Sequence, residues 1–335
     1  MDVVFEVGGL DRLGEHLAQV GARRVLLLTT PSRRFVDRAL RALGDLEKTV
    51  FDGARVHVPA ATVERALSAV DELQADTLVA LGGGAAVGLG KALCLKRELK
   101  LLAVPTTYSG SEMTCIHGVT EDGVKRTGRD ERARPERVLY DAALSRGLPL
   151  PLSLQSLTNA MAQIVSALST ESVPEPDATV GTVGELWQLM SALRADPENL
   201  ALRERALRAA SEAGRVVDVG RMGHQHRLAH LIGGRFDLEH ATVHSVLLPQ
   251  FMAWLRRQRP ELLQALDAAA GVDGLEAALH DLLREVGVPV SLNRLGIRED
   301  ALRALLGDAG DAQSEIAWDA HRGGCPSAGA VLRAP

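Results

Sequence analysis

The hydrophobic and polar positions of the first 150 residues alternate between the periods of strands and helices. Compact apolar runs, each followed directly by proline or glycine, predict strands at 24–30, 77–81 and 101–104, with a weaker strand at 50–58. Apolar residues at helical spacing predict helices at 33–43, 63–73 and 87–95. Because strands that alternate with helices build parallel sheets covered on both faces, the pattern predicts an α/β domain over residues 1–150.

Beyond residue 151 the strand pattern gives way to apolar positions at helical spacing. The predicted helices span 154–168, 183–194, 199–217, 243–257, 260–269, 274–286 and 299–306. A turn-rich segment at 146–153 separates the two patterns. We therefore expect an all-helical domain over 151–320, followed by a loose tail over 321–335.

The composition is that of a soluble globular protein, with 46% hydrophobic and 24% charged residues. The three cysteines are far apart, which excludes a disulfide framework or a zinc knuckle and indicates a reducing cytoplasm. A net charge of −5 argues against nucleic acid as a partner. The sequence shows neither a signal peptide nor an apolar run long enough to span a membrane, so we expect a cytoplasmic protein that acts on a small molecule.

Three consecutive glycines, Gly82, Gly83 and Gly84, connect a predicted strand to a predicted helix. Glycine lets the backbone approach a ligand closely, and the free N–H groups at a helix start bind anions, so this turn is typical of a phosphate site. It matches neither the G-x-G-x-x-G fingerprint nor the P-loop pattern. Lys91, in the first turns of the helix, is either a phosphate contact or a helix-surface lysine.

The next predicted strand ends in the polar string Pro-Thr-Thr-Tyr-Ser-Gly-Ser-Glu over residues 105–112. Open α/β sheets bind ligands at the carboxyl ends of their strands, so Thr106, Thr107 and Ser109 are candidate ligand contacts. A polar turn without a ligand is the alternative. Tyr108 in the same string is a candidate proton donor, although a tyrosine in a turn is more often a packing residue.

Histidines are concentrated in one segment, since five of the ten lie between His224 and His244. Two pairs, His226/His230 and His240/His244, are spaced i,i+4, which places both imidazoles of a pair on one face of a helix. Imidazole is a common metal ligand and the commonest acid–base group near neutral pH. The segment is therefore the strongest candidate for chemistry in this chain.

Several motifs occur together in this chain. They are Gly-Gly-Gly at 82–84, Gly-Leu-Gly-Lys at 88–91, Pro-Thr-Thr-Tyr-Ser-Gly-Ser-Glu-Met-Thr at 105–114, Thr-Gly-Arg-Asp at 127–130, Asn-Ala-Met-Ala at 159–162, and the histidine segment 226–240 with Leu-Leu-Pro at 247–249. Together they resemble the maleylacetate reductases of the iron-containing alcohol dehydrogenase superfamily, which is related in fold to dehydroquinate synthase. The resemblance covers residues 1–260 and continues more weakly to the end.

The resemblance implies a dinucleotide-binding domain followed by a helical domain, with the active site in the cleft between them. NAD(H) or NADP(H) is the implied cofactor, with its pyrophosphate at 82–84 and further contacts from Thr106, Thr107 and Ser109. The implied reaction reduces an unsaturated keto-diacid. Members of the superfamily are commonly dimers or larger, so we expect a homodimer.

The resemblance also implies which residues would hold a metal, and two of them are changed here. Metal-dependent relatives use one Asp and three His, whereas this chain has Asn159 and Gln163 at two of those positions and matches only at His226 and His240. Neutral amides are weak ligands for zinc or ferrous iron, which normally take about three His or carboxylate ligands. His230, His244 or Glu239 could each substitute as a ligand, but nothing in the sequence shows that any of them does. We therefore expect a site without a metal.

Hydride addition to an alkene conjugated to a ketone leaves negative charge on the ketone oxygen, which donors must stabilise. The matching positions favour His226, His230 and His240 for this role and leave His224 and His244 as structural residues. Further candidates for the catalytic group are Tyr108 and His117. Candidate substrate contacts are Asn159, Gln163, Arg126, Arg129 and Arg227, although a solvated charged loop is the alternative for the first two arginines.

A second hypothesis is a divergent, non-reductive enzyme of specialised metabolism on the same scaffold, such as a cyclase, dehydratase or isomerase. The changed ligand positions motivate it, as does Ala85, which follows the glycines where the family usually has Ser. A third is a catalytically inactive binding subunit, which the clustered histidines disfavour. Binding of a reduced nicotinamide cofactor discriminates the reductase from the non-reductive enzyme.

Overall fold

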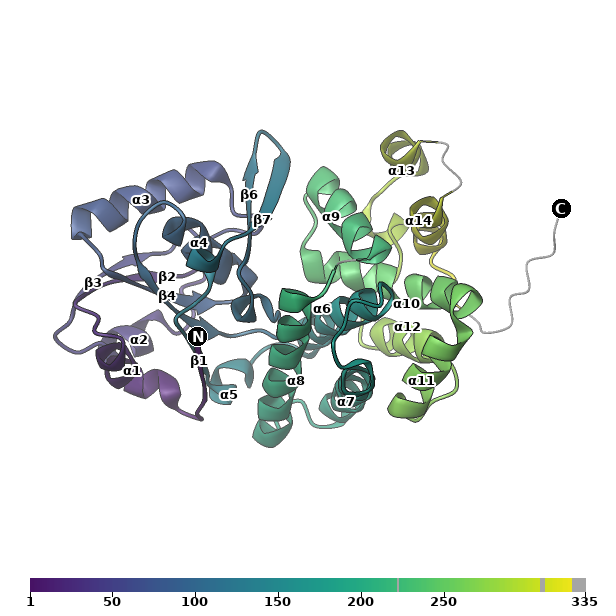
Figure 1. The fold of residues 1–335 in the computed structure, drawn as a ribbon, viewed down its shortest axis with the longest axis horizontal. Coiled ribbons are helices and arrows are strands. Elements are labelled where there is room, and N and C mark those ends of the chain that lie inside the picture. Colours follow the sequence, from purple (N-terminus) through teal and green to yellow (C-terminus); the bar gives the residue numbers. More distant parts are fainter. Residues whose placement is uncertain (222, 308–310, 327–335) are drawn as a thin grey trace. The chain divides into compact units, whose positions relative to one another are not determined.

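The computed structural model of the chain describes residues 1–335 apart from 222, 308–310 and 327–335. Contacts between residues divide the chain into two compact units (Figure 1). The first unit comprises residues 1–148 and 198–218, and the second comprises 149–197 and 219–335. The first division falls close to the expected boundary at 150, but the chain returns to the first unit for one helix.

A parallel sheet forms the centre of the first unit. Among the described residues it has six strands in the order β1-β8-β5-β4-β2-β3, and every neighbouring pair is parallel. The strands are β1 (Asp2–Phe5), β2 (Arg24–Leu28), β3 (Glu47–Phe51), β4 (Thr77–Gly82), β5 (Lys100–Pro105) and β8 (Arg137–Tyr140). The predicted α/β fold class is confirmed, and the three central strands β2, β4 and β5 lie where the apolar runs predicted them.

Helices cover both faces of this sheet (Figure 1). They are α1 (Leu13–Gln19), α2 (Val36–Ala42), α3 (Ala60–Leu73), α4 (Gly84–Cys94), α5 (Ala142–Ser145) and α8 (Leu200–Val219). Val25 and Leu27 of β2 pack in one core with α1 and α2, whereas Leu28 faces Gly90 of α4 on the other side. Because both sets of alternating side chains are buried, the strand is apolar at nearly every position.

A hairpin follows the sheet strand β5. Its strands, β6 (Ile116–Glu121) and β7 (Val124–Arg129), are antiparallel and take the place of the solvated loop considered for this segment. The connecting residues Asp122 and Gly123 have φ angles of 49° and 75°. An Asp-Gly pair with two positive φ angles is the preferred two-residue hairpin turn, so this dipeptide was the available sequence signal.

Buried polar contacts explain why α8 belongs to the first unit rather than to the helical domain expected from its position in the chain. The fully buried guanidinium of Arg203 donates to the hydroxyl of Tyr108 at 3.0 Å and to the carbonyl oxygen of Leu148 at 3.0 Å. A buried guanidinium needs such acceptors, because an unpaired charge away from water is costly. These contacts hold the start of the helix.

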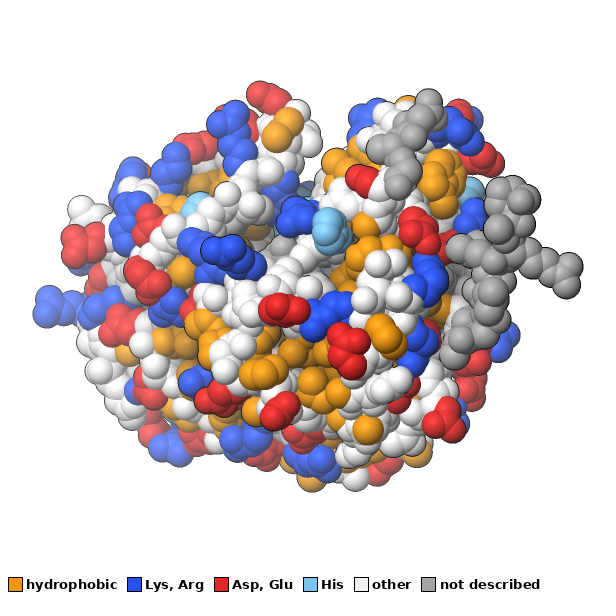
Figure 2. Space-filling view, turned by 45° about the vertical axis from the view of Figure 1, so that its right-hand side comes forward, with side chains coloured by type: hydrophobic (Ala, Val, Ile, Leu, Met, Phe, Trp, Pro, Cys, Tyr) orange, Lys and Arg blue, Asp and Glu red, His pale blue; other side chains and the backbone are white. Residues whose placement is uncertain are grey.

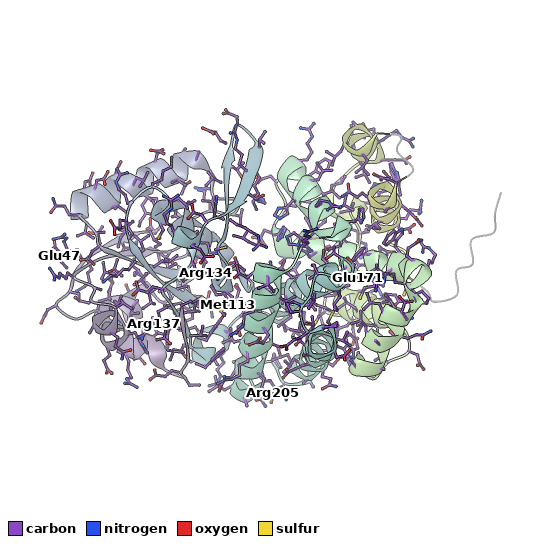
Figure 3. All side chains as sticks on the ribbon, in the orientation of Figure 1. Glu47, Met113, Arg134, Arg137, Glu171 and Arg205 are labelled. Atoms are coloured by element: carbon purple, nitrogen blue, oxygen red, sulfur yellow. The ribbon has the colours of Figure 1, made fainter. Side chains whose placement is uncertain are left out.

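The far end of α8 is held by a carboxylate. Asp218 accepts a hydrogen bond from the backbone N–H of Cys115 at 3.0 Å and forms an ion pair with Arg134 at 2.8 Å. Arg134 and Met113, both labelled in Figure 3, lie side by side, and the guanidinium donates to the Met113 carbonyl at 3.4 Å. The helix is therefore fastened at both ends to the segment that follows β5.

The second unit is helical, as predicted. Its helices are α6 (Leu150–Leu168), α7 (Pro176–Ala195), α9 (His224–Phe236), α10 (His240–Gln258), α11 (Pro260–Ala270), α12 (Leu275–Glu285), α13 (Glu299–Leu306) and α14 (Ala312–Arg322). The first residues of the expected tail are held: His321 bonds the carbonyl of Ile297 at 3.0 Å, and Gln250 donates to that of Gly324 at 2.9 Å. Residues 327–335 of that tail lie outside the described residues.

The surface carries charges of both signs. Figure 2 shows acidic and basic side chains interspersed over the visible face, without a continuous basic area. In the part of the chain that the structure describes, no helix combines the length and the apolar character needed to cross a membrane.

Gly214 of α8 provides a test of this packing, because a Cβ atom added to it would overlap the carbonyl oxygen of Gly110. We expect Gly214→Ala to lower the free energy of unfolding by about 1–3 kcal/mol, since the helix must move away. Urea unfolding followed by circular dichroism measures the change. The control is Gly181→Ala in α7, where an added Cβ meets no atom within 4 Å and the effect should be neutral or stabilising. Equal midpoints for the two variants would contradict the close packing of α8.

Candidate active site

The glycine turn forms the start of α4 in the first unit. β4 ends at Gly82, whose φ of 153° favours glycine, and α4 begins at Gly84 without a side-chain cap. In the first turn the N–H groups of Ala86 and Val87 donate to the Gly83 carbonyl at 3.1 and 3.2 Å, whereas those of Gly84 and Ala85 before them have no acceptor within the helix. A helix start of this kind binds anions, which supports the phosphate site predicted at Gly82, Gly83 and Gly84.

Hydroxyl groups reach this turn from the end of β5. The N–H of Thr106 donates to the carbonyl of Gly82 at 3.1 Å, and a Cβ added to Gly83 would lie only 3.0 Å from the Thr107 hydroxyl oxygen. The structure thus brings two of the predicted cofactor contacts directly against the glycines. A side chain at Gly83 would displace Thr107, so this position requires glycine.

Ser109 lies two residues beyond Thr107 in the same segment. Its hydroxyl donates to Glu112 at 3.1 Å, and the Tyr140 hydroxyl donates to the same carboxyl group at 2.7 Å. Burial raises the pKa of Glu112, and its charged form depends on these donors. Contact of Ser109 with a cofactor stays a prediction.

The structure corrects the predicted phosphate contact of Lys91. Its ammonium group is buried and donates to the carbonyl oxygens of Ser111 at 2.5 Å, Thr114 at 2.7 Å and Ile116 at 2.9 Å. Burial lowers the pKa of Lys91 to about 7. The side chain therefore ties α4 to the segment after β5 and is not available to a ligand.

Tyr108 is also corrected, because its hydroxyl is buried against Arg203 and burial raises the pKa of the phenol. A group held in this way is poorly suited to donate a proton to substrate. His117 lies on β6, where its ring packs over Gly128, and burial lowers the pKa of its imidazole. A catalytic role of His117 stays a prediction.

The three candidate arginines differ in what they contact. Arg129 donates to backbone carbonyls at the end of α8, so its guanidinium joins the hairpin to that helix and is not a substrate anchor. Arg126 is exposed on β7. Arg227 is exposed on α9, where it directly follows His226 in the sequence. One of its guanidinium nitrogens lies 3.3 Å from His224 Nδ1.

Four imidazoles come together in the second unit. α9 ends at Phe236 and α10 begins at His240, so the i,i+4 pair of one helix faces the i,i+4 pair of the other. Ring centroids lie 4.8 Å apart for His226 and His230, 5.3 Å for His226 and His240, and 4.7 Å for His230 and His240. His244 lies 4.3 Å from His240. The structure thus unites the three predicted site histidines and adds a fourth.

His244 is part of a hydrogen-bonded chain that the sequence analysis missed, having assigned this residue a structural role. The amide nitrogen of Gln225 lies 2.7 Å from His244 Nδ1, and His244 Nε2 lies 2.9 Å from His240 Nε2. Burial lowers the pKa of His244 to about 3, with a smaller contribution from His230, so the ring is neutral. Because the amide donates to Nδ1, the single proton of His244 is on Nε2 and is donated to His240.

Asn159 and Gln163 lie on one face of α6, four residues apart and both largely buried. α6 packs against α9 and α10, the helices that carry the histidines. Their amides provide donors and acceptors without charge. Direct contact of either amide with substrate stays a prediction.

Comparison with known proteins identifies the family. Residues 1–142 match the iron-containing alcohol dehydrogenases, and residues 154–317 match the C-terminal part of the Fe-containing alcohol dehydrogenase family. The chain belongs to the iron-containing alcohol dehydrogenase family. The resemblance derived from the sequence is confirmed.

Maleylacetate reductases are among the similar relatives within the family. The chain is 43% identical to maleylacetate reductase 2 of Cupriavidus pinatubonensis, over 84% of this chain and 80% of the relative. It is 37% identical to the maleylacetate reductase of Pseudomonas aeruginosa over 97% of each. The crystal structure of maleylacetate reductase from Agrobacterium tumefaciens has a TM-score of 0.85 at 33% identity, covering 97% of each chain. The chain is an NAD(P)-dependent oxidoreductase.

The family description implies iron, and the donor set of the histidine cluster fits a divalent ion. His226, His230 and His240 each offer a ring nitrogen, and these atoms lie within 4.8 Å of one another. Three imidazoles with an open fourth position make a known catalytic site for zinc and related ions. The expectation of a metal-free site rested on a missing third ligand. Since His230 supplies that ligand, the expectation has lost its support.

Lys91→Met tests the role of the buried ammonium. We expect it to lower the free energy of unfolding by about 3 kcal/mol or more, because several buried carbonyls lose their donor. Chemical denaturation measures the effect against Lys96→Met, an exposed lysine just beyond α4, which should change stability by less than about 0.5 kcal/mol. A Lys91 variant as stable as this control would rule out the proposed anchoring.

Gln225→Met tests the hydrogen-bonded chain with little change in side-chain volume. Nitrogen NMR of histidine-labelled protein should show His244 protonated at Nε2 in the unaltered protein. In the variant, the donor to Nδ1 is lost and a second tautomer should appear. The control is Gln250→Met, which removes a buried amide of α10 that donates to the Gly324 carbonyl at 2.9 Å instead of to a histidine. Identical tautomer populations in all three proteins would contradict the assigned chain.

Proposed function

We propose that this chain reduces the carbon–carbon double bond of an unsaturated keto acid of the maleylacetate type, with NADH or NADPH as hydride donor. The observation that carries the proposal is the histidine cluster, which concentrates imidazole N–H groups where a substrate oxygen needs donors. The relatives named maleylacetate reductases support the substrate class. The changed positions Asn159, Gln163 and Ala85 motivate the non-reductive alternative, but the similarity to maleylacetate reductases favours reduction.

The reaction adds one hydride and one proton. Hydride from the nicotinamide attacks the alkene carbon β to the ketone, and the π electrons move onto the ketone oxygen to form an enolate. A proton then adds to the carbon α to the ketone, which restores the carbonyl group. Donors placed at the enolate oxygen lower the barrier, because they act only as the negative charge develops.

The proton positions in the cluster suit this task. His240 accepts at Nε2 from His244, so a neutral His240 carries its own proton on Nδ1. That N–H is the proposed donor to the enolate oxygen, with His226 and His230 as further donors or proton sources. A divalent ion would replace this arrangement, because His240 could bind it only through a nitrogen released from its proton or from the His244 hydrogen bond; held by the three histidines, it would polarise the ketone as a Lewis acid.

The remaining contacts are part of the same proposal. Gly82, Gly83 and Gly84 with Thr106 and Thr107 are proposed to bind the dinucleotide phosphates. The exposed Arg126 and Arg227 are proposed anchors for substrate carboxylates, and the amides of Asn159 and Gln163 proposed hydrogen-bond partners of substrate. A homodimer and a cytoplasmic location stay predictions.

Alanine substitution tests the cluster directly. We expect His226→Ala, His230→Ala and His240→Ala each to lower kcat for maleylacetate reduction by about 10²- to 10³-fold, because each removes a donor at the developing charge. The loss of reduced-nicotinamide absorbance measures the rate. His224→Ala is the matched control, since His224 packs beside Trp254 outside the cluster, and should stay within about twofold.

Two results would count against the proposal. If neither NADH nor NADPH binds the purified protein, the chain is not a nicotinamide-dependent reductase. If the cluster variants keep the activity of the His224 control, the chemistry lies elsewhere.

A further inference from the structure

The strand beside the glycine turn ends in a group of residues that the proposed function has not used. β2 pairs with β4 in parallel, with Leu27 opposite Val79 and Leu28 opposite Ala80. β2 ends at Leu28, and continuing the same register by two residues would put Thr30 level with Gly82. The segment that follows β2 therefore begins at the same edge of the sheet as the glycine turn, immediately beside it.

This position has a known chemical meaning in dinucleotide-binding sheets. The end of the strand next to the phosphate turn usually meets the adenosine ribose: a carboxylate there accepts from the 2′-hydroxyl of NAD(H), whereas an arginine accommodates the 2′-phosphate of NADP(H). Here the segment reads Thr-Thr-Pro-Ser-Arg over 29–33 and contains no acid. It offers hydroxyl donors and a guanidinium.

The local geometry gathers these groups. The hydroxyls of Thr30 and Ser32 lie 2.9 Å apart, and the N–H of Arg33 donates to the carbonyl of Thr30 at 2.9 Å. Arg33 has a φ of 50°, so the chain turns back at this residue. The hydroxyls of Thr30 and Ser32 and the backbone of Arg33 thus belong to one tight turn.

The acid that contacts this turn is Asp52, which forms an ion pair with Arg33 and follows a different strand. Asp52 follows β3, and β2 lies between β3 and β4 in the sheet. At the end of the β2–β3 pair, the Thr29 N–H donates to the Phe51 carbonyl at 2.9 Å. The Asp52 carboxylate pairs with Arg33 at 2.6 Å. Asp52 is therefore not placed as the ribose acceptor of an NADH-specific site.

Arg33 can exchange this partner for a phosphate. The two side chains of the Arg33–Asp52 pair are 46% and 48% exposed, and exposed ion pairs of this kind contribute little. A guanidinium bound in bidentate fashion to a dianionic phosphate interacts more strongly. A second guanidinium, Arg65 of α3, lies 5.6 Å from the centroid of the Phe51 ring and adds positive charge at the end of β3.

From this arrangement we infer that the chain prefers NADPH, with the 2′-phosphate bound by Thr30, Ser32 and Arg33. The inference rests on the proposed function, which requires a nicotinamide dinucleotide but does not choose between the two. It attributes the choice between NADH and NADPH to the residues that follow β2.

Binding of each nucleotide to the full chain, measured by calorimetry without substrate, tests the inference. NADPH should bind about tenfold more tightly than NADH, and Arg33→Ala should weaken NADPH by about tenfold while NADH changes by less than about twofold. Asp52→Asn should tighten NADPH, because Arg33 is released. Thr30→Asp should reverse the preference, because it supplies the missing carboxylate.

The matched control is Arg23→Ala, which removes the same charge at the opposite end of β2 and should leave the ratio of the two dissociation constants unchanged. Equal binding of NADH and NADPH by the unaltered protein overturns the inference and leaves the reductase proposal intact. Equal weakening of both nucleotides by Arg33→Ala has the same meaning. Binding of neither nucleotide overturns the reductase proposal and this inference with it.

Discussion

The imidazole rings of the second unit are packed so closely that they cannot all carry a positive charge at the same time. Four rings have neighbours at centroid distances between 4.3 and 5.3 Å, and burial lowers the pKa of His244 to about 3. Like charges at this distance repel strongly away from water, so the rings cannot all be protonated together. Neutral imidazoles each have one donor and one acceptor nitrogen, and the chain from Gln225 through His244 to His240 fixes which is which. The same constraint makes the cluster suited to stabilise an enolate or to hold a divalent ion.

A different kind of polar burial organises the first unit. The Lys91 ammonium, the Arg203 guanidinium and the Asp218 carboxylate all hold the segment that runs from the end of β5 towards the hairpin. Removing any partner leaves a buried charge or carbonyl unsatisfied, so these contacts define the segment's path. Thr107 at the start of that segment is thereby kept against the glycine turn. Charged residues held by the protein's own groups thus shape the turn where the dinucleotide phosphates are proposed to bind.

The sequence predicted what depends on local pattern. Apolar runs located the central strands, three glycines located the helix start, and i,i+4 spacing paired the histidines within each helix. The Asp122-Gly123 turn was a local signal that was overlooked.

What the sequence could not provide depends on contacts between distant residues. Tyr108 and Lys91 have the right chemical type for a site, and only the fold shows that both are buried against other groups. The attachment of α8 to the first unit follows from partners up to about 100 positions away along the chain, such as Asp218 with Cys115. The meeting of His230 with His240 depends on how α9 packs on α10, which no periodicity reveals.

The central claim is that hydride passes from a nicotinamide to the alkene carbon of an unsaturated keto acid on this protein. The most direct test is the reduction of maleylacetate with nicotinamide cofactor deuterated at the transferring position, followed by NMR of the product. The account predicts one deuterium on the carbon β to the ketone and a solvent proton on the α carbon. A product without cofactor-derived deuterium, or with deuterium on the carbonyl carbon, would contradict it.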